Sequence, residues 1–243
     1  MLDEYSQSFG SSIKKFEEML KTNFTFFFDA QEIEYIAQHY IDFGKMNLAR
    51  KAIKIGNKQH PCNINILLLK SEILILDEKL KSAKRILAFV HEIEPNNQDA
   101  YIQKASIQSK LKKHNKSIEI LNECLKNSEY KFEVWHLIAL EFLTIGNFQK
   151  AMNYFKLCIE KEPNDHQILY NLIYCIDNLK CFKDGIKILN QILDKDPYNE
   201  LVWLELGKLN LELNKTKDAL NSFDYAILCD DKFSAAYVEK GKL

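Results

Sequence analysis

The stretch GNFQKAMNYFKLCIEKEPN, from Gly146 to Asn164, decides how the rest of the chain is interpreted. Its apolar residues recur at intervals of three and four, which is the spacing of one buried face of an α-helix. The Glu-Pro-Asn near its end favours the end of this helix, because proline cannot continue a helix and asparagine suits the turn that follows. Two further stretches have the same design: LKSAKRILAFVHEIEPN ends at Asn96, and FKDGIKILNQILDKDPYN ends at Asn199. The chain therefore repeats one amphipathic segment and keeps its ending.

All four prolines of the chain occupy one position of a repeat. They are separated by 34 residues or by twice that number, and they are Pro61, Pro95, Pro163 and Pro197. A period of 34 residues with a terminal proline is typical of a repeated helix–turn–helix unit. We therefore divide residues 30–233 into six repeats, which are 30–63, 64–97, 98–131, 132–165, 166–199 and 200–233.

Within each repeat two positions stay small and two stay large. We number the residues of each repeat from 1 to 34 and call each repeat a row. Position 20 is small in every row, and its occupants are Ala49, Ala83, Ser117, Ala151, Gly185 and Ala219. Position 8 is small in all rows except the fifth, where Ile173 stands. Positions 4 and 24 are large, as with Trp135 and Phe155 in the fourth row. Small residues let two helices approach closely and large ones fill the space between them, so we expect antiparallel helix pairs. Ile173 is expected to widen the fifth pair.

The fourth row resembles the tetratricopeptide repeat (TPR) at nine positions, which are Trp135, Ile138, Ala139, Phe142, Gly146, Ala151, Phe155, Cys158 and Pro163. The resemblance extends over residues 30–233. It implies an all-α fold in which antiparallel helix pairs stack into a right-handed superhelical solenoid. The third and sixth rows depart from the pattern at the terminal position, where Glu129 and Asp231 replace proline.

The composition agrees with a helical protein. Only 7 glycines and 4 prolines in 243 residues are too few for the many tight turns of a β-sandwich or barrel. The formal net charge is −1, and Arg50 and Arg85 are the only arginines, so we expect no nucleic-acid partner. No apolar run approaches the ~20 residues of a membrane span, and the N-terminus lacks a secretory pattern. We expect a cytoplasmic protein with reduced cysteines.

The segment before the repeats, residues 1–29, is expected to form a capping helix and an aromatic linker. The helix is predicted to start at Ser11–Ser12, and its apolar stripe consists of Ile13, Phe16, Met19 and Leu20. Asp29 and Glu32 predict a capping box at the start of the first repeat. The linker carries four phenylalanines, which are Phe24, Phe26, Phe27 and Phe28. They either cover the end of the first repeat or mediate self-association.

The segment after the repeats, residues 234–243, matches the first helix of a further repeat, with Tyr237 and Gly241 at positions 4 and 8. Its partner helix does not follow. We expect either a natural cap or an excised fragment of a longer protein, and we favour the fragment.

Motifs that carry chemistry are not found in the sequence. It has no glycine-rich phosphate loop, no HExxH, no GxSxG and no CxxC pair. Cys175 and Cys181 lack a histidine at zinc-ligand spacing, and Cys124 and Cys158 share a position that packs against the neighbouring helix. We therefore expect no catalytic residue, no metal and no cofactor.

The TPR resemblance also implies which residues contact a partner. In this family the first helix of each repeat lines a concave groove, and positions 2, 5, 9 and 12 point into it. The candidate contact residues are Gln38, Glu72, His136, Tyr170, Tyr174 and Lys208. The implied lining contains one lysine and five acids, which are Glu34, Glu72, Asp99, Glu133 and Asp177. It becomes apolar and aromatic from the fourth row onward. A neutral or basic peptide, or an amphipathic helix, is the expected ligand.

The role of the leucines in this lining stays open, whereas one class of ligand is not expected. Leucines at positions 5 and 12, such as Leu140, Leu204 and Leu211, either contact the ligand or pack between repeats. The Lys/Asn/Lys/Arg clamp with which co-chaperone TPR domains hold an acidic terminus is not present in any row, so we expect no binding of heat-shock-protein tails.

These observations favour a non-catalytic scaffold for protein–protein interaction. Two alternatives remain. The chain is a structural homo-oligomer that associates through its phenylalanine-rich linker or its C-terminal half-repeat, or it is the scaffold or regulatory part of a longer enzyme or regulator.

Overall fold

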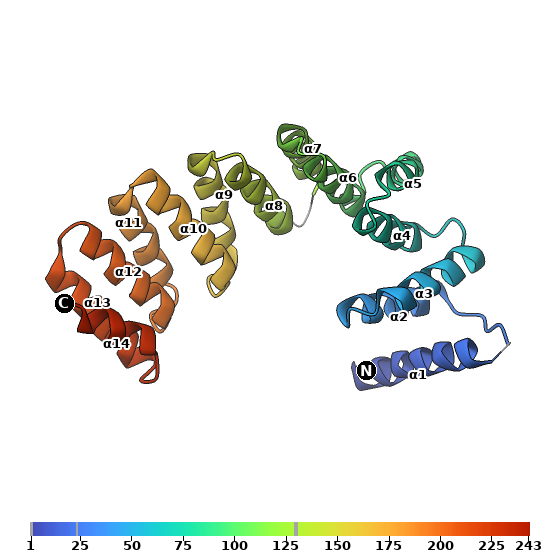
Figure 1. Ribbon diagram of the computed structural model, residues 1–243, viewed down its shortest axis with the longest axis horizontal. Helices are drawn as coiled ribbons and strands as arrows, with labels where there is room; N and C mark the ends of the chain where they lie inside the picture. The colour runs from blue at the N-terminus through green and yellow to red at the C-terminus, as the bar shows by residue number, and fades with distance from the viewer. Residues whose placement is uncertain (1, 23, 129–130) are drawn as a thin grey trace. The chain divides into compact units, whose positions relative to one another are not determined.

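The computed structural model describes residues 2–22, 24–128 and 131–243, and these residues form helices joined by short turns, with no strand among them (Figure 1). The chain divides into two compact units, Met1–Leu111 and Lys112–Leu243. The helices of the first unit are α1 (Leu2–Lys21), α2 (Ala30–Asp42), α3 (Met46–Gln59), α4 (Ile64–Leu76), α5 (Leu80–Ile93) and α6 (Gln98–Lys110). The helices of the second unit are α7 (His114–Asn127), α8 (Lys131–Thr144), α9 (Phe148–Lys161), α10 (His166–Leu179), α11 (Phe182–Leu193), α12 (Glu200–Glu212), α13 (Thr216–Cys229) and α14 (Ser234–Gly241). The predicted all-α fold is confirmed. Among the described residues, no helix is both long and apolar enough to cross a lipid bilayer.

The helices begin at fixed positions of the 34-residue period. The second helix begins at position 17 in all six rows, from Met46 in the first to Thr216 in the sixth. The first helix begins at position 1 in every row except the fourth, where α8 begins one residue earlier, at Lys131. The helix starts thus recur with the 34-residue spacing of the prolines. The replacement of proline at Glu129 lies outside the described residues.

Each proline is followed two residues later by the residue that caps the next helix. The four caps are Asn63, Asn97, Asp165 and Asn199. In each case the side-chain oxygen accepts a hydrogen bond of 2.9–3.1 Å from the backbone N–H three residues further on. This bond satisfies one of the backbone donors that a helix start leaves unpaired. The proline therefore helps to end one helix while the polar residue starts the next.

The turn inside each repeat has a feature that the sequence does not reveal. Position 15 adopts a left-handed conformation in all six rows, with φ between 52° and 74°, at Gly44, Glu78, Lys112, Gly146, Lys180 and Asn214. The next backbone N–H then bonds back to the end of the first helix, as from Lys45 to the Tyr40 carbonyl at 2.7 Å. This bond ends the first helix in a Schellman-like turn.

Burial confirms the packing assigned to three of the four positions, while at position 4 the side chains of Tyr101, Trp135 and Trp203 are only half-buried. All occupants of positions 8, 20 and 24 are buried. The closest approach is at position 8 of the sixth row, where a Cβ on Gly207 would lie 2.3 Å from Cε1 of Phe223. In the fifth row, α10 and α11 make few close backbone contacts, whereas α10 packs closely on α9 and α11 on α12. The effect expected of Ile173 on the spacing of this pair stays a prediction.

The N-terminal helix begins earlier than predicted. It starts at Leu2 instead of Ser11. The sequence before Ser11 has no proline, and its apolar residues Leu2, Tyr5 and Phe9 continue the three-and-four spacing, so nothing there ends a helix. The predicted stripe is also wrong at its last member, because the Leu20 side chain is exposed.

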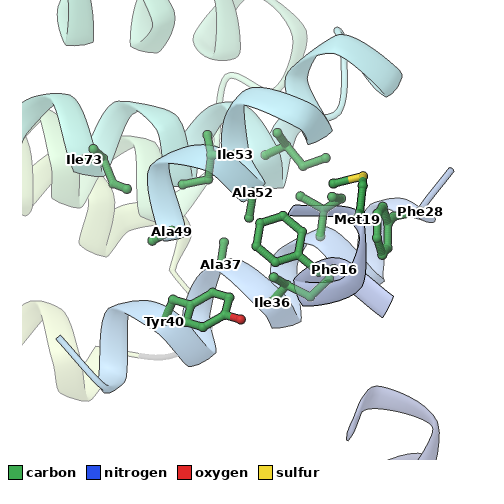
Figure 2. Close-up of a cluster of buried hydrophobic side chains, with 12 residues drawn as sticks. Phe16, Met19, Phe28, Ile36, Ala37, Tyr40, Ala49, Ala52, Ile53 and Ile73 are labelled. Atoms are coloured by element: carbon green, nitrogen blue, oxygen red, sulfur yellow. The ribbon is translucent and has the colours of Figure 1, made fainter. Parts of the chain in front are cut away.

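The rest of the stripe joins α1 to the first repeat. Figure 2 shows Phe16, Met19 and Phe28 gathered beside Ala52 of α3 in one buried cluster. The Phe16 ring lies 6.2 Å from that of Phe28 and 5.8 Å from that of Tyr40, measured between centroids. Burial raises the pKa of Tyr40 to about 12, and the nearby Glu17 carboxylate contributes to the shift.

The predicted capping box is confirmed and also ties α1 to α2. The Glu32 carboxylate accepts hydrogen bonds from the Asp29 backbone N–H at 2.9 Å and from the Ser12 hydroxyl at 2.5 Å. Burial acts to raise the pKa of Glu32, but these two hydrogen bonds and the charge of Lys15 together outweigh it, so the pKa is lowered.

The phenylalanine-rich linker covers the first repeat only in part. Phe28 is buried and Phe26 packs against the same cluster, whereas 72% of Phe24 and 62% of Phe27 is exposed. The Gln59 side chain holds this non-helical segment by donating to the Phe26 carbonyl at 2.8 Å and accepting from the Phe28 N–H at 3.2 Å. Phe24 and Phe27 therefore leave most of their side chains uncovered, although the Phe27 ring lies 5.4 Å from that of His60, centroid to centroid.

Candidate protein-binding surface

In the first unit, the implied lining positions of consecutive repeats adjoin one another. Helices α2, α4 and α6 pack in succession. Asn65 at position 2 of the second row donates a 3.1 Å hydrogen bond to the Glu34 carboxylate at position 5 of the first row. Glu72 at position 9 lies within electrostatic range of Asp99 at position 2 of the third row. Polar residues at some of these positions therefore adjoin one another in pairs across neighbouring first helices, Asn65 with Glu34 and Glu72 with Asp99, and they are named here the first-helix face.

That face has an acidic character. Burial raises the pKa of Glu72, and repulsion by the Asp99 carboxylate adds to the shift. Gln38, the other candidate residue of this unit, is exposed, and its amide donates to Asp42 at 2.8 Å. A cationic partner group would relieve the repulsion between the two acids.

Because the pKa of Glu72 is raised, its ionised form is disfavoured in the folded state. The replacement Glu72→Gln is expected to raise the melting temperature at pH 7, where the carboxylate is charged. The gain should shrink as the pH falls through the raised native pKa and should vanish below the ordinary pKa of 4.5, because the carboxyl is then protonated in both the folded and the unfolded state. Thermal unfolding followed by circular dichroism checks this, with the exposed Glu92→Gln as control. A gain of equal size at both pH values would contradict the electrostatic explanation.

In the second unit, two tyrosines protrude from α10. About half of each side chain is exposed, 50% for Tyr170 and 53% for Tyr174, and the two lie one helical turn apart. The next helix turn presents Asp177, which is also exposed. The opposite side of α10 is buried through residues such as Leu172 and Ile176. The helix thus anchors its apolar side in the core and displays the tyrosines.

Lys208 of α12, the first helix of the next repeat, lies within electrostatic range of Asp177. Burial raises the pKa of Asp177; Lys180 and Lys208 oppose the shift and Glu212 adds to it. Lys208 itself forms a 2.8 Å ion pair with the buried Glu205 carboxylate. The single lysine of the implied lining is therefore already paired within its own helix.

His136 is held within the packing of its repeat. Its ring lies 6.2 Å from that of Phe155 and 6.5 Å from that of Phe132, centroid to centroid. The side chain is half-buried, and its buried Nε2 has no hydrogen-bond partner in the described part of the chain. His136 is therefore less accessible than the tyrosines of α10.

Comparison with known proteins matches these repeats. A sequence model of the tetratricopeptide repeat matches residues 98–130 and 132–165. The chain thus contains tetratricopeptide repeats in these residues. A curated relative, the DnaJ homolog subfamily C member 3 homolog of Dictyostelium discoideum, is 28% identical over 145 residues, which are 53% of this chain and 29% of that protein.

Solved structures share the TPR fold. YrrB, described as "a TPR protein with an unusual peptide-binding site", has a TM-score of 0.52 and 14% identity, over 79% of this chain and 98% of YrrB. The pilF protein of Pseudomonas aeruginosa has a TM-score of 0.61 and 10% identity, over 88% of this chain and 97% of pilF. At these identities the likeness concerns the fold.

Part of the implied TPR lining is wrong. Four apolar residues at positions 2, 5 and 12 are buried between helices and cannot reach a ligand; they are Leu68, Ile75, Leu201 and Leu204. Their side chains fill the contact between neighbouring helices, where burial of apolar surface is favourable. Leu140 and Leu211 are half-buried.

The cysteines pack as the sequence indicated. Cys124 and Cys158 are buried, and burial raises the pKa of the Cys158 thiol to about 12, with a contribution from the charge of Asp165. Burial likewise raises the pKa of Cys175 to about 11. Thiols of this kind are poor nucleophiles and poor metal ligands. In the described ranges, no group of three or more His, Cys, Asp or Glu residues has an arrangement that would hold a metal ion.

The six candidate contact residues thus fall into two sets. Gln38 and Glu72 belong to the first unit, and His136, Tyr170, Tyr174 and Lys208 belong to the second.

Proposed function

We propose that this TPR protein is a non-catalytic scaffold that binds a peptide or helical segment of a partner protein along the first helices of its repeats. The observation that carries the proposal is the pair Tyr170 and Tyr174, half-exposed and one turn apart on α10. A tyrosine on a rigid helix offers a large apolar ring with a polar tip, and it loses little side-chain freedom when it is covered. A role in protein binding also agrees with the family.

The partner segment is proposed to be neutral or basic. Carboxylates at the lining positions include Glu34, Glu72 and Asp177, and the facing Lys208 is paired with Glu205. Charges on a partner affect the rate and selectivity of association more than the final affinity. We also propose that the protein is located in the cytoplasm.

The tyrosine pair provides the test. A partner is first isolated by affinity capture with the full chain, and its binding segment is synthesised. The double variant Tyr170→Ala/Tyr174→Ala is then expected to weaken that segment's Kd about tenfold or more, which corresponds to ~1.4 kcal/mol. Its melting temperature should remain near that of the wild type, because both rings are half-exposed.

A matched control replaces two exposed tyrosines elsewhere in the second unit, Tyr198→Ala/Tyr237→Ala. This variant should bind the segment like the wild type. Unchanged affinity in the α10 variant, or a loss of stability with no loss of binding, would rule out the tyrosines as the contact.

Self-association is the second candidate function, favoured by the exposure of Phe24 and Phe27. Exposed aromatic side chains close together are typical of contact surfaces. The molar mass in solution, measured by light scattering at increasing concentration, decides between a monomer and an oligomer.

A further inference from the structure

A cavity lies between α3 and α4 in the first unit, away from the face described above. Its volume is about 360 Å³. Its apolar lining comes from Ile53, Ile73 and Leu74. Figure 2 shows Ile53 and Ile73 on these neighbouring helices, where both belong to the buried cluster. The floor of the cavity is therefore a fixed apolar surface.

The rim of this cavity is strongly basic. Arg50, Lys54 and Lys58 line it at intervals of four residues along α3. At 1.5 Å per residue, this row is ~12 Å long. Lys70 and Lys79 complete the rim.

One carboxylate faces these five cations. Asp77 lies 2.5 Å from Arg50 and 3.4 Å from Lys79, measured between side-chain nitrogen and oxygen. Lys70 donates only to the neutral Asn57 amide, at 3.3 Å. In the described residues, no carboxylate lies within 4 Å of the amines of Lys54, Lys58 or Lys70.

The cavity and the first-helix face use different sides of α4. Lys70, Ile73 and Asp77 follow one another at three-and-four spacing along the side that lines the cavity. Asn65 and Glu72 lie on roughly the opposite side, because each residue advances the helix by about 100°. A ligand in the cavity therefore does not compete with one on the acidic face.

We propose that this cavity, named here the α3–α4 site, binds an acidic segment of a partner protein, with one apolar side chain on the isoleucine floor and carboxylates along the lysine rim. The length of the rim supports a peptide. An extended chain covers ~12 Å in three to four residues, whereas a single small anion would meet only part of the row. The apolar floor supports a segment in which a hydrophobic residue stands between acids.

A second cavity shows that this charge is particular to the α3–α4 site. It lies between α9 and α11 in the second unit and has a volume of about 330 Å³. Its lining contains two lysines, Lys156 and Lys195, and two acids, Glu160 and Asp194. Similar size with balanced charge makes it a suitable internal control.

The test uses the full chain and a fluorescein-labelled peptide of nine residues, with leucine at the centre, two glutamates on each side and serines at the ends. Fluorescence anisotropy is expected to show saturable binding that weakens with added salt. Lys54→Glu/Lys58→Glu should weaken the peptide about tenfold or more, whereas Lys156→Glu/Lys195→Glu should leave the affinity within about twofold. A peptide with serine instead of leucine should bind several times more weakly. Circular dichroism confirms that both variants remain folded.

Three results would overturn the proposal. They are the lack of saturable binding at millimolar peptide, an equal loss in both lysine variants, and equal affinity for the serine peptide. Displacement of the peptide by octanoate at the same concentration would assign the α3–α4 site to small organic carboxylates and would also overturn it. The Tyr170→Ala/Tyr174→Ala variant should bind the acidic peptide normally, so this test and that of the proposed function fail independently.

Discussion

Replacing Phe155 by alanine is expected to lower the free energy of unfolding of the second unit by about 3–5 kcal/mol. Phe155 occupies position 24 of the fourth repeat on α9 and is fully buried. Its ring packs against that of His136 on the paired helix α8. Alanine would remove the ring and leave a cavity between two helices that other contacts hold in place. Urea denaturation followed by far-UV circular dichroism measures the change as a lower midpoint.

The matched control lies two residues away on the same helix. Leu157 is 38% exposed, so Leu157→Ala should cost less than ~1 kcal/mol. Similar losses of unfolding free energy in the two variants would mean that alanine has the same effect at any position of helix α9. Position 24 would then have no special packing role.

The buried positions could be predicted because each of them occurs six times. A single alanine such as Ala151 does not by itself predict close helix packing. A small residue at position 20 of every row does, because it indicates that two helices approach each other there. Ile173 is the one departure from the small residues at position 8, and it is buried like the occupants of that position in the other rows. Repetition separates the packing residues from surface residues that vary freely.

The left-handed turn at position 15 could not be predicted in the same way. Glycine, which adopts this conformation at no steric cost, stands there only in Gly44 and Gly146. Glu78, Lys112 and Lys180 adopt it at a cost of roughly 1–2 kcal/mol each. The hydrogen bonds that end the preceding helix offset this cost, and they depend on geometry that residue types alone do not express.

The candidate surface was predictable where exposure follows from helix periodicity alone. Tyr170 and Tyr174 are exposed because they face away from the apolar side of α10, which the sequence displays directly. Leu201 was misplaced, and the role of Leu204 was left open, because their burial depends on how closely the neighbouring helices approach. That distance is a property of the assembled repeats and is not encoded in one row.

The basic α3–α4 site could likewise be predicted only in part from the sequence. The spacing of Arg50, Lys54 and Lys58 is visible in the sequence, but a row of charges on a helix is ordinarily solvated and carries no function. The row becomes a rim only because α3 and α4 leave a cavity beside it, floored by Ile53 and Ile73. The charges were evident from the sequence, and the cavity required the structure.

Replacing Gly207 by alanine is expected to destabilise the second unit by about 1–3 kcal/mol, although alanine is the better helix former. The added Cβ would lie 2.3 Å from Cε1 of the fully buried Phe223 ring, so the ring or the helix would have to shift. Gly10→Ala is the control, because Gly10 is also helical and a Cβ there meets nothing within 4 Å. It should stabilise α1 by ~0.5–1 kcal/mol.

A double-mutant cycle separates the clash from any other effect of the substitution at Gly207. Phe223→Leu alone should destabilise, because it removes part of a buried ring. In the Phe223→Leu background, Gly207→Ala should cost much less than it does beside the intact ring, because leucine lacks the aromatic carbon that the new Cβ would meet. Urea denaturation of the four proteins gives the coupling energy. Additive losses would show that Gly207 and Phe223 do not restrict each other, and that the close approach of α12 and α13 does not depend on the small residue at position 8.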